Sequence, residues 1–118
     1  MANTCVWFDI PATDLKRAEK FYSAVLDAKV EPIPGMEGFV LPHKGEEVSG
    51  CVFKKSGEAP SAEGVLIYLN AQGRLADAVA KVEANGGLIL QPAHPIGPYG
   101  FRAVIRDSEG NRIALHSM

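Results

Sequence analysis

The sequence of 118 residues has only two cysteines, Cys5 and Cys51, and no apolar run near the ~20 residues of a membrane span. Two distant cysteines outside any paired motif argue against a disulfide framework and against a structural zinc site. The first residues show no basic stretch followed by a long apolar one, so we expect no secretory signal. These absences predict a cytoplasmic protein without a membrane partner.

A large excess of positive or negative charge is also missing. Lysine and arginine total 12 and aspartate and glutamate total 14, which gives a formal net charge of −2. Without a basic excess we expect no nucleic-acid partner. Hydrophobic residues make up 47% of the chain and charged residues 22%, a composition typical of a folded globular protein rather than a disordered one. The length predicts a single domain over residues 1–118.

Hydrophobic periodicity predicts two helices, at residues 14–26 and about 74–84. Thr13 or Asp14 is the expected N-cap of the first, and Asn85-Gly86-Gly87 is a stop signal for the second. A hairpin turn is expected at 106–111. Short alternating runs predict eight strands, at residues 5–10, 29–33, 38–41, 48–54, 65–70, 88–91, 101–106 and 112–116.

These elements repeat along the chain. An offset of 60 residues relates Leu15 to Leu75 and Pro32 to Pro92, so the order strand, helix and three strands occurs twice. We therefore predict an α+β fold of two βαβββ modules, at about residues 1–57 and 62–118. Chance matching of common apolar residues is the alternative explanation of the repeat.

Alternation along the strands predicts two different sheet faces. The aliphatic face should pack under the two helices, and its members are Val6, Phe8, Ile10, Val65, Ile67, Leu69, Ala103, Ile105, Ile113 and Leu115. The opposite face mixes aromatic, polar and cationic side chains: Cys5, Trp7, Asp9, Leu66, Tyr68, Asn70, Arg102, Val104, Arg106, Arg112, Ala114 and His116. The mixed face could meet solvent, a partner or a ligand.

Three segments carry a family resemblance: residues 7–22 (WFDIPATDLKRAEKFY), Asn85-Gly86-Gly87, and residues 106–115 (RDSEGNRIAL). With the duplicated module, they make the chain resemble the vicinal oxygen chelate superfamily, which includes glyoxalase I, bleomycin-resistance proteins and extradiol dioxygenases. The resemblance implies a curved, eight-stranded, partly open barrel. It also implies a small-molecule ligand inside the cup and a homodimer, since members of the superfamily usually bind ligands at a dimer interface.

Metal-dependent members hold a divalent ion with side chains from the first and last strands of each module. The resemblance places these positions at Trp7, at Leu66 or a neighbour, near Gly50 or Cys51, and at Ala114. Tryptophan, leucine and alanine cannot coordinate a metal, and a lone cysteine is a poor substitute. We therefore expect no metal, no cofactor and no glyoxalase I activity on hemithioacetals.

Six residues are candidates for contact with a ligand: Trp7, Cys51, Tyr68, Tyr99, Arg102 and His116. Trp7 and Tyr68 either stack on a flat ligand or fill the barrel floor. Arg102 suits an anionic group. His116 either faces the cup or belongs to a frayed end of the chain.

The other candidates have weaker support. Tyr99 lies in the Pro/Gly-rich segment 95–100, which is either a lid or a connector. Cys51 is either a nucleophile without an evident base or an inert buried thiol. His43 and His94 are expected in loops, where histidines are usually solvated.

Two functional hypotheses follow. The first is a protein that binds a small aromatic or anionic organic molecule in the cup without a metal ion. The alternative is a glyoxalase-like lyase or isomerase, or a dioxygenase-related enzyme, with an atypical site. A subunit or regulatory domain with no ligand is a third possibility. Metal content and ligand-induced stabilisation discriminate between the first two.

Overall fold

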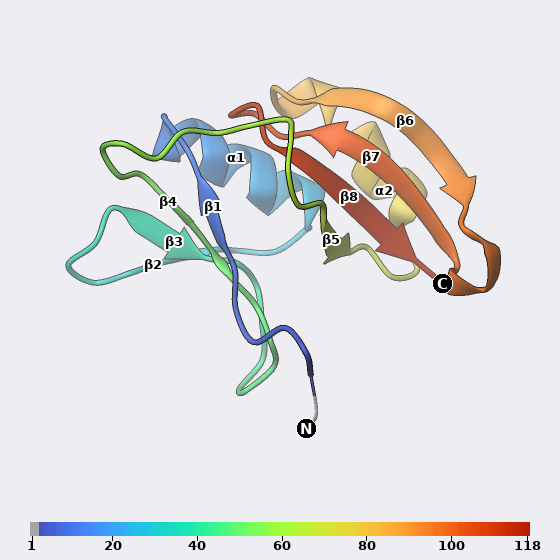
Figure 1. Ribbon diagram of the computed structural model, residues 1–118, viewed down its shortest axis with the longest axis horizontal. Helices are drawn as coiled ribbons and strands as arrows, with labels where there is room; N and C mark the ends of the chain where they lie inside the picture. The colour runs from blue at the N-terminus through green and yellow to red at the C-terminus, as the bar shows by residue number, and fades with distance from the viewer. Residues whose placement is uncertain (1–2) are drawn as a thin grey trace.

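Two four-stranded sheets with two helices make up the computed structural model, which describes residues 3–118 (Figure 1). The N-terminal sheet contains β1 (Asp9–Pro11), β2 (Glu31–Pro32), β3 (Gly38–Val40) and β4 (Cys51–Phe53), with α1 (Leu15–Val25) after β1. The C-terminal sheet contains β5 (Ile67–Asn70), β6 (Leu88–Pro95), β7 (Phe101–Arg106) and β8 (Arg112–Ser117), with α2 (Leu75–Ala80) after β5. Two short 3₁₀ helices, η1 (Glu83–Asn85) and η2 (Gly97–Tyr99), flank β6. The predicted α+β fold of two βαβββ modules is confirmed.

Both sheets share one topology. Their strand orders are β1-β4-β3-β2 and β5-β8-β7-β6, and in each the first strand runs parallel to the last while the other pairs are antiparallel. Within residues 3–118 no strand of one sheet pairs with a strand of the other, so the barrel is not closed. Strands β1 and β5 consequently each have a free edge.

Helix α1 begins where the sequence predicts. The Asp14 side chain caps it by accepting a hydrogen bond from the Arg17 backbone N–H at 3.1 Å. Its apolar face buries Ala18, Phe21, Tyr22 and Val25, which recur at helical spacing. Helix α2 ends at Ala80, earlier than the predicted end at about 84, and the 3₁₀ helix η1 continues the chain to Asn85. Gly86 ends η1 with a left-handed φ of 94°, the conformation that the Asn-Gly-Gly stop signal predicts.

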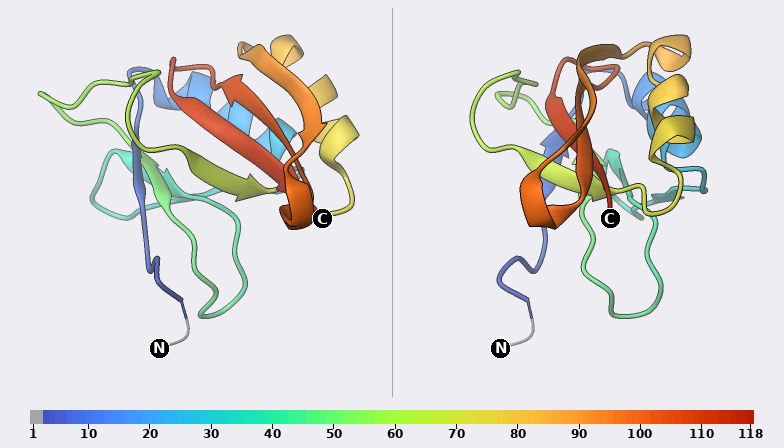
Figure 2. Two further views of the ribbon diagram at one scale, coloured as in Figure 1. Left: turned by 45° about the vertical axis from the view of Figure 1, so that its right-hand side comes forward. Right: turned by 90° about the vertical axis from the view of Figure 1, so that its right-hand side faces the viewer.

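The helices cover one side of the sheets and leave the other side open (Figure 2). A single hydrophobic cluster joins side chains of both sheets and both helices. Its members include Ile10, Phe21, Phe39, Val52, Leu69, Leu75, Ala103, Ile105, Ile113 and Leu115. The predicted aliphatic faces therefore pack under the helices, and the mixed face of the C-terminal sheet remains on the uncovered side.

Four strands start later than predicted: β2 and β4 begin at Glu31 and Cys51 rather than at 29 and 48, and the delay at β1 and β5 exposes apolar residues. The expected strands 5–10 and 65–70 begin only at Asp9 and Ile67, and Val6 and Val65 are 75% and 88% exposed rather than buried. Among the described residues, β1 and β5 pair only with β4 and β8, and this pairing starts at Cys51 and Ile113. An extended segment without a neighbour has no sheet to place its side chains in a core.

Strand β6 is longer than predicted and contains His94, which is therefore not a loop residue. It holds Pro92 and Pro95 because it is the edge strand, where a missing N–H is tolerated. Its pairing with β7 shifts register twice, between Ile89 and Gln91 and between Gln91 and His94.

The described residues include no helix that is both long and apolar enough to cross a membrane.

Candidate functional site

The six candidate residues fall into two groups on different sheets. Trp7 and Cys51 lie by the N-terminal sheet, where both contact Asp9. Tyr68, Arg102 and His116 lie on the C-terminal sheet, with the Tyr99 backbone against them. Between the two groups, no hydrogen bond or aromatic contact occurs in residues 3–118. The structure therefore does not assemble all six residues into one site.

A polar row crosses the C-terminal sheet on its open face. The register places Asn70, His116, Arg102 and His94 opposite one another, one from each strand. Residues adjacent in sequence, such as Leu69, Leu115 and Ala103, form the next row and are buried under the helices. Because side chains alternate along a strand, the polar row faces away from the helices.

Arg102 is the central group of this row. Its Nε donates to His94 Nε2 at 3.0 Å, and its Nη1 donates to the Tyr68 hydroxyl at 2.6 Å. The guanidinium carbon also lies 5.9 Å from the centre of the Tyr68 ring. No carboxylate of the described chain lies within 4.0 Å of Arg102, whereas Arg17 and Arg74 each form an ion pair. Arg102 is thus fixed by neutral partners and keeps an uncompensated charge.

His116 is held in place and is not part of a frayed end. Its Nε2 donates to the Tyr99 carbonyl oxygen at 2.6 Å, and its ring meets the Tyr68 ring edge-on at 6.2 Å. Tyr99 contributes only this carbonyl, because its side chain is 71% exposed. Positive φ angles at Gly97 and Gly100 turn the chain so that the carbonyl reaches His116.

The N-terminal group is a small hydrogen-bonded cluster around Asp9. One carboxylate oxygen accepts from Trp7 Nε1 at 3.1 Å and from the Cys51 thiol at 3.2 Å. Burial raises the pKa of Cys51, and the hydrogen bond and charge of Asp9 raise it further, to about 11. Cys51 therefore stays a neutral thiol near pH 7 and is not set up as a nucleophile.

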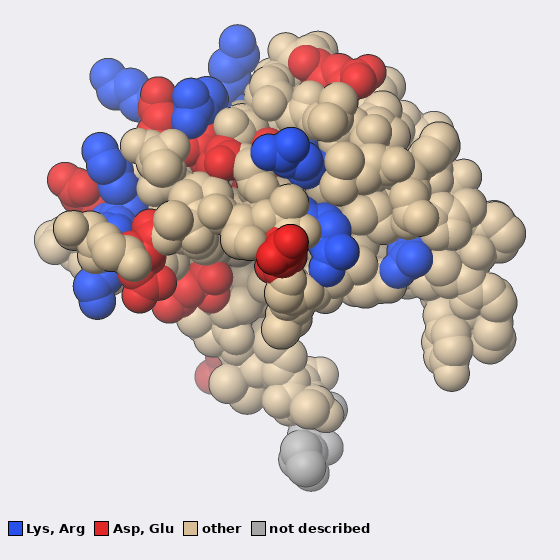
Figure 3. Space-filling model, turned by 45° about the horizontal axis from the view of Figure 1, so that its top comes forward, with Lys and Arg blue, Asp and Glu red and all other residues tan. Residues whose placement is uncertain are grey.

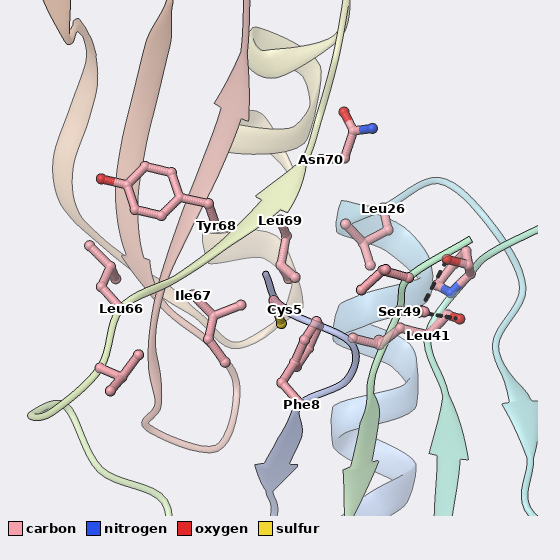
Figure 4. Close-up of a pocket in the computed structure, with 13 residues that line it drawn as sticks. Cys5, Phe8, Leu26, Leu41, Ser49, Leu66, Ile67, Tyr68, Leu69 and Asn70 are labelled. Atoms are coloured by element: carbon pink, nitrogen blue, oxygen red, sulfur yellow. Dashed lines mark hydrogen bonds between the residues drawn. The ribbon is translucent and has the colours of Figure 1, made fainter. Parts of the chain in front are cut away.

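The largest cavity described, of about 640 Å³, lies between the free edge of β5 and the N-terminal sheet. Ile67 and Leu69 point toward Phe8 across it, while Tyr68 points to the opposite side of the strand (Figure 4). Its lining contains no charged residue, and neither Arg102 nor His116 contributes to it. Arg102, His116 and His94 therefore lie on an open sheet face rather than in this cavity, and of the polar row only Asn70 borders it.

The positions at which the resemblance implies metal ligands do not form a metal site. They hold Trp7, Leu66, Ala114, and Gly50 or Cys51, of which only Cys51 has a donor side chain suited to a metal. Throughout residues 3–118, no three His, Cys, Asp or Glu side chains come together in a way that could hold an ion. The residues present thus do not fit the divalent ion of metal-dependent relatives.

Two partners in these clusters were absent from the six candidates. Asp9 shares a predicted face with Trp7, so strand alternation was the signal for it. His94 had no such signal, because two register shifts in β6 decide which of its residues face Arg102.

Comparisons with known proteins agree with the fold. A family model described as the glyoxalase/bleomycin resistance protein/dioxygenase superfamily matches residues 4–115. A glyoxylase-like domain-containing protein of Didymella fabae is 33% identical over 116 residues, covering 91% of this chain and 88% of that protein. A putative glyoxylase, CFP32, of Mycobacterium bovis is 27% identical over 113 residues, covering 92% of this chain but only 43% of that protein.

Solved structures share the architecture at low sequence identity. A glyoxalase/bleomycin resistance protein from Albidiferax ferrireducens T118 has a TM-score of 0.83 at 19% identity, covering 98% of this chain and 99% of that chain. A lactoylglutathione lyase from Agrobacterium tumefaciens has a TM-score of 0.63 at 16% identity, covering 99% and 95%. From the fold, the family model and the sequence relatives together, the chain belongs to the glyoxalase/bleomycin resistance protein/dioxygenase superfamily.

Proposed function

We propose that the protein binds a small organic anion on the open face of the C-terminal sheet, with the anionic group on Arg102 and a flat apolar part against Tyr68. The observation that supports this most directly is the state of Arg102. It is half-buried, oriented by His94 and Tyr68, and without a carboxylate partner in the described chain. A cation fixed by neutral acceptors is available to an incoming anion.

The hydrogen bonds of Arg102 also set the direction of approach. Its Nε is occupied by His94, and one N–H of Nη1 is occupied by the Tyr68 hydroxyl. The N–H groups that remain, on Nη1 and Nη2, form the end-on fork that matches two oxygens of a carboxylate, phosphate or phosphonate. The proposed ligand class is therefore an organic molecule that carries a carboxylate, a phosphate or a phosphonate.

The rest of the surface suits a flat apolar body. Tyr68, Ala114 and Val104 lie opposite one another in the row beside Arg102. Ala114 and Val104 are buried, so the exposed Tyr68 ring is the apolar group of this row that a ligand can reach. An aromatic ring in such a position gains contact area and stacking.

We infer that a second copy of the chain covers this open face. Charged side chains gather over one side of the molecule, and the other side, which carries β6 and β7 in Figure 1, is largely uncharged (Figure 3). Exposed apolar side chains on or beside these strands include Leu88, which pairs with Arg106 and so shares the open face, and Tyr99 in η2. Large exposed apolar patches mark interaction sites, and self-association usually uses one patch twice.

Binding is favoured over the lyase, isomerase or dioxygenase alternative by the state of Cys51. The nucleophile that the sequence offers is kept protonated by burial and by Asp9. The polar row itself supplies a cation, a phenol and imidazoles, which are groups for holding an anion.

The test compares benzoate with benzamide, its neutral counterpart, by calorimetric titration. We expect benzoate to bind at least tenfold more tightly, and Arg102→Met to remove that preference, because hydrogen bonds to charged groups contribute about 1.5–3 kcal/mol. Arg106→Met is the matched control, since Arg106 is exposed and has no ion-pair partner in the described chain. Equal binding of the two probes, or full benzoate affinity in Arg102→Met, would contradict the proposal.

A further inference from the structure

His94 holds a position that only one form of its ring can satisfy. The Nε–H of Arg102 can only donate, so His94 Nε2 must accept that bond, at 3.0 Å. The Pro92 carbonyl oxygen can only accept, so His94 Nδ1 must carry a hydrogen toward it, at 2.8 Å. Together the two contacts define a neutral imidazole in its Nδ1–H form.

Irregular pairing of β6 with β7 sets the position of the His94 ring. Two register shifts in β6 insert extra residues between Ile89 and His94, so that Gln91 pairs with Val104 and His94 pairs with Arg102. In a regular strand paired from Ile89 with Ile105, Gln91 would oppose Ala103 and face the helices. The same regular strand would place His94 opposite Gly100, on the face that it shares with Leu88. The two shifts together keep His94 on this open face and change its cross-strand partner to Arg102.

We propose that His94 is a positioning residue for the anion site, acting through Arg102. The neutral His94 ring accepts from Arg102 Nε, and the Tyr68 hydroxyl accepts from Arg102 Nη1. These two hydrogen bonds fix the plane of the guanidinium and direct its remaining N–H groups at the open face. The inference rests on the proposed anion-binding function. It adds to that function a specific requirement: the Arg102 fork is preorganised by an imidazole that does not itself touch the ligand.

If His94 preorganises Arg102, substitutions of His94 should differ in their effect on ligand affinity. A flexible arginine side chain that loses one of its two anchors must be ordered by the ligand at binding, which weakens affinity. His94→Phe keeps a planar ring but removes the acceptor. His94→Gln keeps an acceptor oxygen about as far from the backbone as Nε2.

The experiment has two readouts. The first is nuclear magnetic resonance of the protein labelled with ¹⁵N, without ligand. We expect the His94 ring to show the Nδ1–H form, and the Arg102 Nε–H signal to exchange slowly in wild type and His94→Gln but rapidly in His94→Phe. An Nε2–H form of His94, or an Arg102 signal unchanged in His94→Phe, would overturn the proposal.

The second readout is benzoate affinity. We expect His94→Phe to bind about five- to tenfold more weakly, and His94→Gln to stay within about threefold of wild type. His43→Phe is the matched control, because His43 is an exposed histidine whose ring contacts only the Gly45 carbonyl. Thermal unfolding of each variant shows whether weaker binding comes from the lost hydrogen bond to Arg102 or from unfolding of the protein.

The two proposals fail in different ways. If wild type does not prefer benzoate over benzamide, the anion site is refuted, while the resonance signals of His94 and Arg102 still decide the positioning role. If benzoate binds through Arg102 and His94→Phe binds it as tightly as wild type, the positioning role alone is refuted.

Discussion

The hydroxyl of Tyr22 on α1 lies 2.5 Å from a carboxylate oxygen of Asp107, in the turn between β7 and β8. The contact is buried, and it joins the helix of the first module to the hairpin of the second. Burial raises the pKa of Tyr22 well above its usual value, and the charge and hydrogen bond of Asp107 add to this, so the phenol remains a donor. Asn111 donates to the same carboxylate oxygen at 3.0 Å.

Removing the Tyr22 hydroxyl should weaken the contact between the modules. We expect Tyr22→Phe to lower the free energy of unfolding by about 1–3 kcal/mol, because a buried carboxylate loses a hydrogen bond. Urea unfolding measures this difference in the free energy of unfolding. Tyr99→Phe is the control, since the Tyr99 side chain is largely exposed, and it should change stability very little. Equal losses in both variants would argue against a role for the buried bond.

The Glu109 carboxylate should make stability depend on pH. It accepts from the Thr13 and Asp14 backbone N–H groups, at 2.8 and 2.7 Å, and from Arg17 Nε at 2.7 Å. Burial would raise the pKa of Glu109, but these hydrogen bonds and one from Ser108 outweigh it and lower the pKa from 4.5 to about 2. The contribution is then complete above about pH 4.5 and is lost as the pH falls toward 2.

Glu109→Gln tests this dependence by urea unfolding at several pH values. We expect the variant to be about 1–2 kcal/mol less stable than wild type at pH 7, since it loses a charge at the start of α1 and an ion pair. The difference should shrink below pH 4.5. Glu58→Gln, at an exposed glutamate, should show no such trend. A difference that stays constant down to pH 2.5 would refute the explanation.

The two cysteines should differ in reactivity. Cys5 is exposed, whereas Cys51 is buried with a pKa of about 11, which leaves roughly 0.1% thiolate at pH 8. A disulfide reagent at pH 8 should modify Cys5 quickly and Cys51 only after unfolding, so Cys5→Ser should show no fast phase. Asp9→Asn should speed the reaction of Cys51, because Asp9 raises its pKa. Rapid native-state modification of Cys51 would contradict the observed burial.

Gly87 should be intolerant of any side chain. A Cβ at this position would lie 2.6 Å from the Arg106 carbonyl oxygen and 2.6 Å from the Phe21 ring. We expect Gly87→Ala to cost about 2–4 kcal/mol by thermal or urea unfolding, because the backbone must shift. Gly73→Ala is the comparison: it has a positive φ but open space, so about 1 kcal/mol is expected. Similar costs at both positions would mean that crowding is not the cause.

The inferred dimer predicts a concentration-dependent mass. Sedimentation equilibrium should give twice the 12.6 kDa chain mass at tens of micromolar. Leu88→Asp should weaken the association at least tenfold, because it buries a charge in an apolar interface. Met36→Asp, at an exposed apolar residue of the N-terminal module, should leave it unchanged. A monomer for wild type at these concentrations would refute the inference.

Regular strands made part of the site predictable from the sequence. Tyr68, Arg102 and His116 were placed on one face by alternation, because β5, β7 and β8 pair without register shifts. The same reasoning misplaced Val6 and Val65, since alternation describes a strand but does not say where a neighbouring strand ends. It also missed His94, because a bulge adds a residue without any fixed sequence signal.

Long-range contacts were the other limit. The tethering of His116 by the Tyr99 carbonyl depends on a turn with two positive φ angles, and the pairing of Tyr22 with Asp107 spans 85 positions. Neither residue type nor spacing encodes such a contact. The helix starting at Asp14 and the stop at Gly86 are local, so caps and turn residues predicted them.

The prolines of β6 have a consequence for how copies of this chain can meet. Pro92 and Pro95 supply no N–H, and the two register shifts between Ile89 and His94 break the even spacing of the remaining groups along this outer strand. Another strand therefore cannot pair with β6 through a continuous ladder of backbone hydrogen bonds, and this protects the sheet from fibrillar aggregation. Leu88 and Leu90 can remain exposed on this strand, and two molecules that associate here must do so by packing side chains rather than by extending the sheet.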